Sequence, residues 1–157
     1  MSYLTLKSLH IFSLVLLFGT GLGSAFYKFM ADLHGDVRAI YTTNKHVVLA
    51  DWWFTTPTVL IQPITGYYLQ QQLPFSLTTP WLLVSVMLYL LAGACWLPVV
   101  FLQIRMRELS RQAVEQNTGL TGEYFRCARL WFWLGVPAFA AMVLIVMLMV
   151  LKPALWG

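Results

Sequence analysis

Three long stretches of the chain contain no Asp, Glu, Lys or Arg, namely residues 8–27, 52–104 and 130–151. A helix needs about 20 apolar residues to cross a hydrocarbon core of roughly 30 Å, so the first and last stretches each provide one crossing. The middle stretch is long enough for two, and its centre, QQQLPFSLTTP, has the polar residues and prolines of a loop. The pattern predicts an all-α integral membrane four-helix bundle, a single domain over residues 1–157 with spans at about 8–27, 50–69, 81–104 and 130–151.

The composition argues against a water-soluble protein. Hydrophobic residues make up 59% of the chain and charged residues 10%, whereas an ordinary soluble domain has roughly 25% charged residues. Basic residues lie at the span ends and form no patch interleaved with aromatic residues, which argues against nucleic-acid binding. Cys95 and Cys127 lack the spacing of a disulfide pair. Without an HExxH, CxxC, GxSxG or phosphate-loop motif, the chain gives no support for a hydrolase or a nucleotide-driven pump.

Lys and Arg residues are unevenly divided between the two sides of the predicted bundle. One side carries only Lys7 and Lys152, and the two charged loops of the other carry Lys28, Arg38, Lys45, Arg105, Arg107, Arg111, Arg126 and Arg129. Because cytoplasmic loops are enriched in basic residues, both termini are expected in the periplasm.

The segment after the third span should begin as a helix. Met106, Leu109 and Ala113 recur there at helical spacing. Gly119 and Gly122 should then break the helix, and Thr121 is a suitable N-cap for the last one.

Polar residues of the second predicted span share one helical face. They are Asp51, Thr55, Thr58, Gln62, Thr65 and Gly66, within an arc of about 100°. Such a face should point into the bundle, either as hydrogen-bonding contacts between helices or as the wall of a cavity. Pro57 and Pro63 lie off this face and predict a kinked or locally opened helix, in which Thr hydroxyls can satisfy the freed carbonyls.

Asp51 is an ionisable residue at the membrane boundary, where an unpaired charge costs a few kcal/mol. Arg105 and Arg129 end the third and fourth spans on the same side, so a structural ion pair of Asp51 with one of them is expected. The alternative is a solvated carboxylate at the interface.

Two other spans present matching faces. His10 and Ser13 lie on the polar face of the first span, and Ser85 and Tyr89 lie on that of the third, at a depth similar to Gln62. Either His10 binds a metal centre there, or its ring hydrogen-bonds Gln62 or a backbone carbonyl. Most tryptophans, Trp131 included, flank the spans as an interfacial belt, and Trp96 is the one expected inside the bundle.

The first span, LKSLHIFSLVLLFGTGL, is similar to the opening of the HemJ-type protoporphyrinogen oxidases, and FTTPTVLIQPITGYYL resembles their second span. This resemblance implies a membrane protein that binds haem b, with His10 as a ligand or essential residue. Those enzymes carry a lysine in the third span where this chain has Ser85, which argues against porphyrinogen oxidation. The segment KHVVLADWWFTTPTVLIQPITGYYL, and nearly the whole chain, more closely resembles the predicted integral membrane proteins of the family designated domain of unknown function 2269.

Together these observations lead to a hypothesis of a multi-pass protein of the bacterial inner membrane. It would bind haem b or a related tetrapyrrole in the bundle and serve a redox role as a possible membrane oxidoreductase. His10 would be the metal ligand, in a cofactor pocket of His10, Ser13, Gln62, Ser85 and Tyr89. Its partners would be the lipid bilayer, a quinone or redox protein, and a second copy of the chain. A non-enzymatic accessory or assembly subunit is the alternative, and a small transporter subunit is the third.

Overall fold

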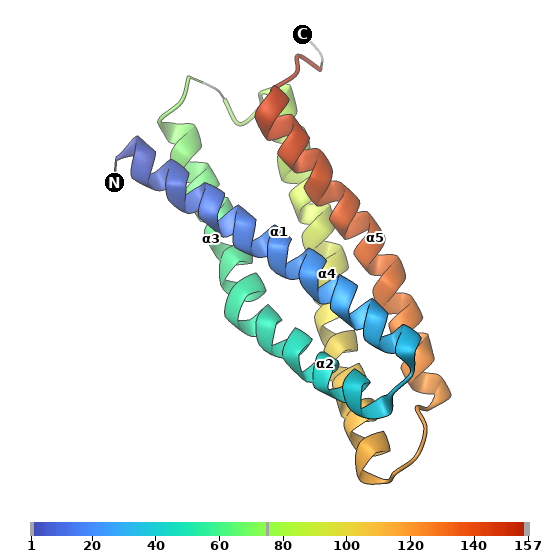
Figure 1. The fold of residues 1–157 in the computed structure, drawn as a ribbon. Coiled ribbons are helices and arrows are strands. Elements are labelled where there is room, and N and C mark those ends of the chain that lie inside the picture. The colour runs from blue at the N-terminus through green and yellow to red at the C-terminus, as the bar shows by residue number, and fades with distance from the viewer. Residues whose placement is uncertain (1, 75, 156–157) are drawn as a thin grey trace.

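The computed structural model describes residues 2–74 and 76–155, and its regular structure there is entirely helical. The elements are α1 (Tyr3–His34), α2 (Val37–Ala50), the short π-helix η1 (Asp51–Thr55), α3 (Thr56–Gln71), α4 (Pro80–Glu115) and α5 (Gly122–Leu151) (Figure 1). Because α2, η1 and α3 follow one another without a break, they form one continuous rod of helix, which we call the α2–α3 rod.

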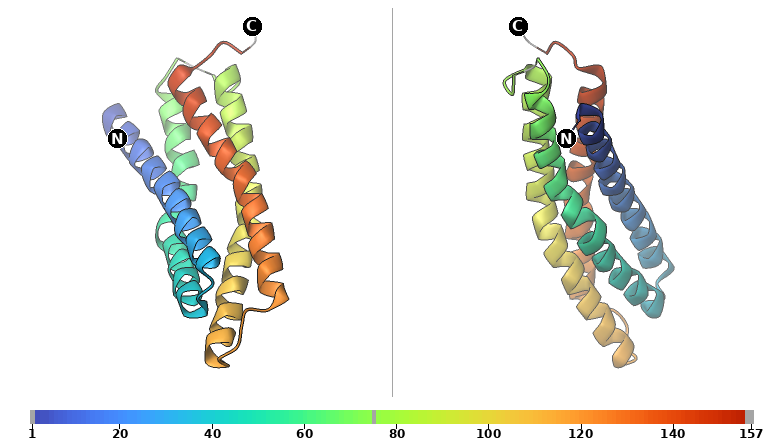
Figure 2. Two further views of the ribbon diagram at one scale, coloured as in Figure 1. Left: turned by 45° about the vertical axis from the view of Figure 1, so that its right-hand side comes forward. Right: turned by 90° about the vertical axis from the view of Figure 1, so that its left-hand side faces the viewer.

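The helices are arranged as two antiparallel pairs. The α2–α3 rod packs along α1, and α4 packs along α5 over most of their length (Figure 2). Both chain termini and the loop between α3 and α4 lie at one end of the bundle, which we call the terminal end (Figure 1). The turn between α1 and α2 and the loop between α4 and α5 lie at the opposite end, which we call the turn end. Contact between α2 and α4 joins the two pairs.

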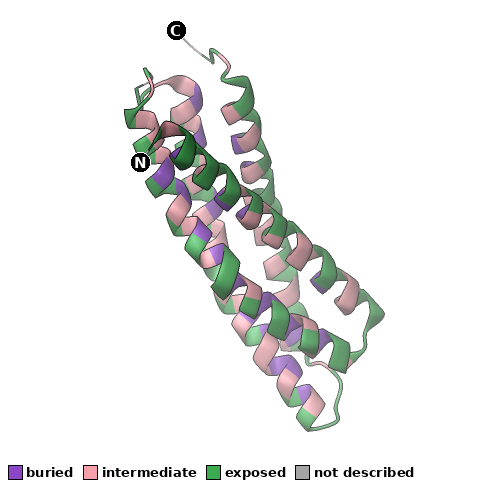
Figure 3. Cartoon of the chain, turned by 60° about the vertical axis from the view of Figure 1, so that its left-hand side comes forward, coloured by how far each residue is buried: buried purple, intermediate pink, exposed green. Residues whose placement is uncertain are grey.

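Three helices of the described residues, α1, α4 and α5, are each long and apolar enough to cross a membrane. Their large apolar side chains cover the outside of the bundle, so the outward faces are mostly exposed and the buried residues lie where helices meet (Figure 3). This is the reverse of a water-soluble bundle and suits a hydrocarbon solvent. The predicted all-α membrane fold is confirmed at this level, with three candidate spans.

The predicted charged loop after the first span is wrong. At about 1.5 Å per residue the 32-residue α1 is roughly 48 Å long, so it continues well beyond the thickness of a hydrocarbon core. Gly35 then turns the chain, with a left-handed φ of 74° and its N–H donating to the carbonyl of Ala31. Asp36 caps α2 by accepting from the N–H of Arg38. The basic residues of this region therefore lie on helices.

The two boundaries predicted around the α4–α5 loop are confirmed. Helix α4 continues to Glu115, and the Thr121 side chain accepts a hydrogen bond from the N–H of Tyr124 at the start of α5. A small apolar core forms between these ends and α2, from Ile40, Met106, Leu109 and Tyr124. This core fastens the two helix pairs together at the turn end.

Candidate functional site

The polar face predicted on the second span lies inside the bundle. Its five polar side chains are buried, namely Asp51, Thr55, Thr58, Gln62 and Thr65. Several of them serve the rod itself: Thr58 donates to the carbonyls of Phe54 and Thr55, and Thr65 donates to that of Ile61. Such bonds within one helix satisfy the hydroxyls, and they often bend the helix. Asp51 and Thr55 belong to the site described below.

A wide turn interrupts the rod at Asp51–Thr55, where the N–H of Thr56 donates to the carbonyl of Asp51 as in a π-helix. Pro57 follows at the start of α3 and Pro63 lies inside it, so the predicted local opening is present. Because proline has no N–H, Pro63 cannot donate to the carbonyl four residues earlier, which is that of Val59. The Tyr89 hydroxyl of α4 donates to this carbonyl at 2.6 Å. The kinked rod is thereby held to the second helix pair.

A cavity of about 500 Å³ lies between α1, the rod, α4 and α5. Its wall is mostly aromatic, aliphatic and small side chains, which include Gly21, Gly93 and Gly135. Phe18 of α1 and Phe139 of α5 meet across the wall with ring centroids 5.1 Å apart. A concave apolar site of this size with few polar groups is typical of small-molecule binding.

Three buried polar atoms without a hydrogen-bond partner belong to residues that line this cavity. They are Oδ2 of Asp51 and the indole Nε1 atoms of Trp96 and Trp131, and they are all the orphaned side-chain atoms in the described part of the chain. The other carboxylate oxygen of Asp51 accepts from the Thr55 hydroxyl at 2.8 Å, and the Gln103 amide lies close to the same carboxyl group. Unpaired buried polar groups are rare, and their gathering at one cavity indicates a missing partner.

The predicted ion pair of Asp51 differs from the observed contacts. Arg105 points out of the bundle and pairs with Glu123 of α5 at 2.7 Å, and Arg129 is exposed. Asp51 lies in the π-helix and faces inward, with an exposed fraction of 7%, whereas Arg105 lies on the outer surface of α4. Asp51 is therefore a carboxyl group of the cavity rather than half of an ion pair.

The five residues predicted as a haem pocket do not form one pocket. His10, Ser13 and Gln62 come together, because the Ser13 hydroxyl and the Gln62 amide both donate to the carbonyl of His10 at 3.0 Å. Ser85 donates to the carbonyl of Trp81 in its own helix. Tyr89 lines the cavity, and His10 does not.

The His10 ring packs onto α3. Its Nδ1 lies 2.7 Å from the Thr65 hydroxyl, which already donates to a carbonyl, so this nitrogen carries the proton and donates. Its Cε1 faces Gly66, where a Cβ atom would be only 3.3 Å away. Gly66 therefore makes room for the imidazole, and the ring bonds the Thr65 hydroxyl, a partner that was not predicted, while the Gln62 amide bonds the backbone carbonyl of His10.

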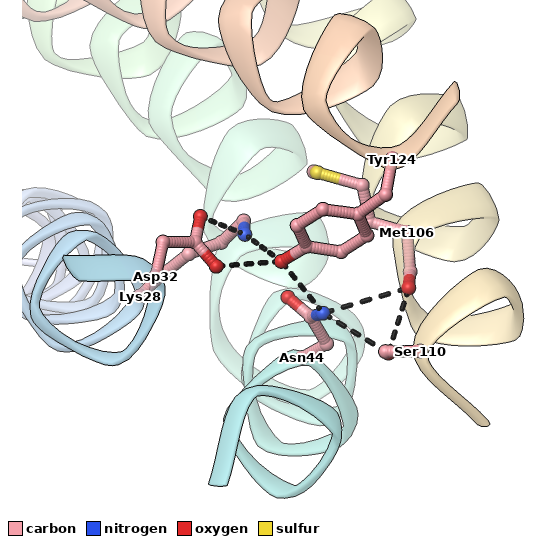
Figure 4. A network of polar contacts seen from close by, with 6 residues as sticks. All are labelled: Lys28, Asp32, Asn44, Met106, Ser110 and Tyr124. Atoms are coloured by element: carbon pink, nitrogen blue, oxygen red, sulfur yellow. Dashed lines mark hydrogen bonds and ion pairs between the residues drawn. The ribbon is translucent and has the colours of Figure 1, made fainter. Parts of the chain in front are cut away.

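A second polar cluster lies at the turn end and was not predicted (Figure 4). Lys28, with 1% of its surface exposed, donates to Asp32 at 2.8 Å and to the Tyr124 hydroxyl at 3.0 Å. That hydroxyl donates to Asp32 at 2.6 Å and accepts from the Asn44 amide, which also donates to Ser110. The i,i+4 spacing of Lys28 and Asp32 was the one signal of this cluster in the sequence. We call it the Lys28 cluster.

The Lys28 cluster borders the cavity through a shared indole. The Lys28 ammonium lies 5.4 Å from the centre of the Trp131 ring, and Trp131 lines the cavity. The assignment of Trp131 to an interfacial belt is therefore wrong, because the ring is held inward by the buried cation. Trp96 lies inside the bundle, as predicted.

Comparisons with known proteins agree with the membrane fold. Neither the curated proteins nor the solved structures gave a match. The family described as "Predicted integral membrane protein (DUF2269)" matches residues 4–153, which is nearly the whole chain. The chain therefore belongs to the DUF2269 family of integral membrane proteins.

Proposed function

We propose that this protein binds an amphipathic small molecule within the membrane, in the cavity between its helices. The observation that carries the proposal is that the three residues with an unpartnered buried polar atom, Asp51, Trp96 and Trp131, all line one cavity. A buried donor or acceptor without a partner costs about 1–3 kcal/mol. A ligand that pairs with all three atoms would relieve this cost, and the energy regained would contribute to its affinity. The apolar remainder of the wall suits a lipid-soluble body.

The proposal includes a fourth membrane crossing made by the α2–α3 rod. Its residues 52–71 contain no charged side chain, and the rod runs beside α1 from the turn end to the terminal end (Figure 1). The buried Asp51 and the π-helix fall near the middle of the rod, where a ligand inside the membrane would meet them. A carboxyl group at such a position is by default a candidate for function.

Haem, which the resemblance to HemJ-type enzymes implied, does not fit these residues. The described residues that line the cavity include no histidine, and a methionine such as Met142 binds haem iron together with a histidine. The hydroxyl of Tyr89, another type of haem ligand, is bonded to the carbonyl of Val59. The His10 ring packs on α3, with Nδ1 bonded to Thr65 and Cε1 against Gly66. Nor does the described part of the chain contain a cluster of three or more His, Cys, Asp or Glu residues suited to a metal. Haem and a haem-based redox step are therefore not part of the proposal.

Ligand content of the purified protein tests the proposal. The full chain is purified in mild detergent, extracted with organic solvent, and the extract is compared by mass spectrometry with that of Trp96→Phe, which removes one orphaned N–H and keeps an aromatic ring. The matched control is Trp133→Phe, because Trp133 is 65% exposed and lies outside the cavity wall. We expect one species to be abundant in the wild type and the control and depleted in Trp96→Phe.

An extract in which no species is enriched over the detergent and bulk lipid background would contradict the proposal and favour the accessory-subunit alternative. A Soret band that is retained in Trp96→Phe and lost in His10→Ala would also contradict it, in favour of haem. Both outcomes are visible in the same preparations.

A further inference from the structure

We infer that the ligand is an uncharged single-chain lipid whose head carries hydroxyl groups. This inference rests on the proposed function and concerns the chemistry of the molecule that occupies the cavity. It follows from three features of the wall, namely which polar atoms are unpaired, where they lie, and how much space remains beyond them.

The unpaired atoms belong to residues of the cavity wall, so a ligand that pairs with them must supply both donors and acceptors. An indole N–H can only donate, so Trp96 and Trp131 each require an acceptor. Oδ2 of Asp51 requires a donor when the carboxyl group is ionised and an acceptor if that oxygen carries a proton. A hydroxyl group meets both demands, because it donates one hydrogen bond and accepts others.

Charged heads match this wall less well. A carboxylate or phosphate would place a second negative group beside Asp51 in a poorly solvated site. An ammonium could pair with Asp51 but has no acceptor, so both indole N–H groups would remain unpaired. The nearby cation, Lys28, is already bonded to Asp32 and Tyr124 and is separated from the cavity by the Trp131 ring. An uncharged head with several oxygen atoms is the class that pairs all three groups.

The positions of these groups place the head and the chain. Asp51, Gln103 and Trp131 lie in the half of the cavity nearer the turn end, and Trp96 lies seven residues before Gln103 on α4, or about 10 Å along the helix. A glycerol monoester and an alkylated hydroquinone each carry two or more oxygen atoms on one uncharged head, which can meet side chains that extend from both positions. The apolar wall continues toward the terminal end as far as Tyr89 and Met142.

The volume suits one hydrocarbon chain. The wall on α4 extends from Tyr89 to Gln103, a rise of roughly 21 Å at 1.5 Å per residue. A volume of about 500 Å³ over this length gives a mean cross-section of roughly 24 Å². This space is sufficient for one extended chain.

The test compares probes that share one lauryl chain and differ in the head. The full chain is placed in phosphatidylcholine nanodiscs, and its thermal midpoint is followed as monolauroylglycerol, dodecylhydroquinone, lauric acid or dodecylamine is added. Native mass spectrometry counts the probe molecules that remain bound. Each titration is repeated with Trp96→Phe, Trp131→Phe and the exposed control Trp133→Phe, so that general effects of the probe on the bilayer cancel.

We expect at least one of the two hydroxyl-bearing probes to raise the midpoint at one molecule per chain. Its apparent dissociation constant should rise about fivefold to tenfold in Trp96→Phe and in Trp131→Phe, as expected for one lost hydrogen bond, and stay unchanged in the control. A preference for dodecylhydroquinone over monolauroylglycerol would assign the hydroxyls to an aromatic head, and the reverse preference would assign them to a glycerol head.

Stabilisation by lauric acid or dodecylamine equal to that of the hydroxyl probes, with the same loss in Trp96→Phe, would overturn the inferred head group and leave cavity binding intact. Equal binding of the hydroxyl probes to all variants would overturn the inference by placing the site elsewhere. Absence of binding by every probe, together with an extract that contains no enriched species, would overturn the proposed function as well.

Discussion

At the scale of single residues, the hydroxyl of Tyr124 is the centre of the Lys28 cluster. This hydroxyl bonds Lys28, Asp32 and Asn44, and the Tyr124 ring lies 5.2 Å from the Lys28 ammonium. A buried cation is tolerated only when its donors are satisfied, so Tyr124 and Asp32 together make the position of Lys28 possible. The hydroxyl joins α1, α2 and α5 at the turn end (Figure 4).

Tyr124→Phe should destabilise the protein by about 1–3 kcal/mol, because it leaves buried donors of Lys28 and Asn44 unpaired without removing the ring. Thermal unfolding in a fixed detergent measures the effect. Tyr67→Phe is the matched control, since Tyr67 is 52% exposed on α3. Identical midpoints for the two variants would show that the cluster contributes nothing to stability.

At the scale of elements, the π-helix η1 decides which side chains reach the cavity. A π turn contains one residue more than an α turn, so it shifts the phase of α3 relative to α2 by about 100°. With this shift, Asn44 of α2 can face α4 while Thr58 and Gln62 of α3 face inward. Asp51 and Thr55 lie within η1 and point to the cavity.

Deletion of Trp53, which is 71% exposed, should convert η1 to ordinary α-helix and misalign the two halves of the rod. We expect the cavity ligand to be lost while helical content, measured by far-UV circular dichroism, is kept. Trp53→Leu, which keeps the residue count, should retain the ligand. If the deletion variant is helical and extracts with full ligand content, the π-helix does not position the site.

At the scale of the whole molecule, both termini lie at the terminal end of the bundle (Figure 1). Eight of the ten Lys and Arg residues belong to the segments around the opposite end, the turn end. The positive-inside rule predicts that this end lies in the cytoplasm. The cavity groups Asp51, Gln103 and Trp131 would then lie toward the cytoplasmic leaflet.

A C-terminal fusion to a reporter that is active only in the cytoplasm should therefore be silent. The same reporter inserted after Gly119, in the loop between α4 and α5, should be active. Alkaline phosphatase at the two sites should give the reverse pattern. Strong cytoplasmic activity of the C-terminal fusion would overturn the topology.

The sequence by itself determined the membrane class, the helices and the inward polar face. Long uncharged stretches leave the backbone no alternative to helix in lipid, and residues at helical spacing must share a face, so Thr58, Gln62 and Thr65 were predicted to be buried. Pro57 and Pro63 likewise predicted a break in the rod, and Thr121 predicted the start of α5. These are properties of one helix and its solvent.

Only the tertiary structure decided which inward groups meet and which remain unpaired. Phase within one helix contains no information on its rotation against a neighbour, so Asp51 was assigned to Arg105 although the π-helix turns it to Gln103 and the cavity. The buried position of Lys28 depends on Tyr124, a residue 96 positions away. The unpaired atoms of Asp51, Trp96 and Trp131 can be identified only from the complete structure, because an atom is unpaired only if none of its neighbours bonds it.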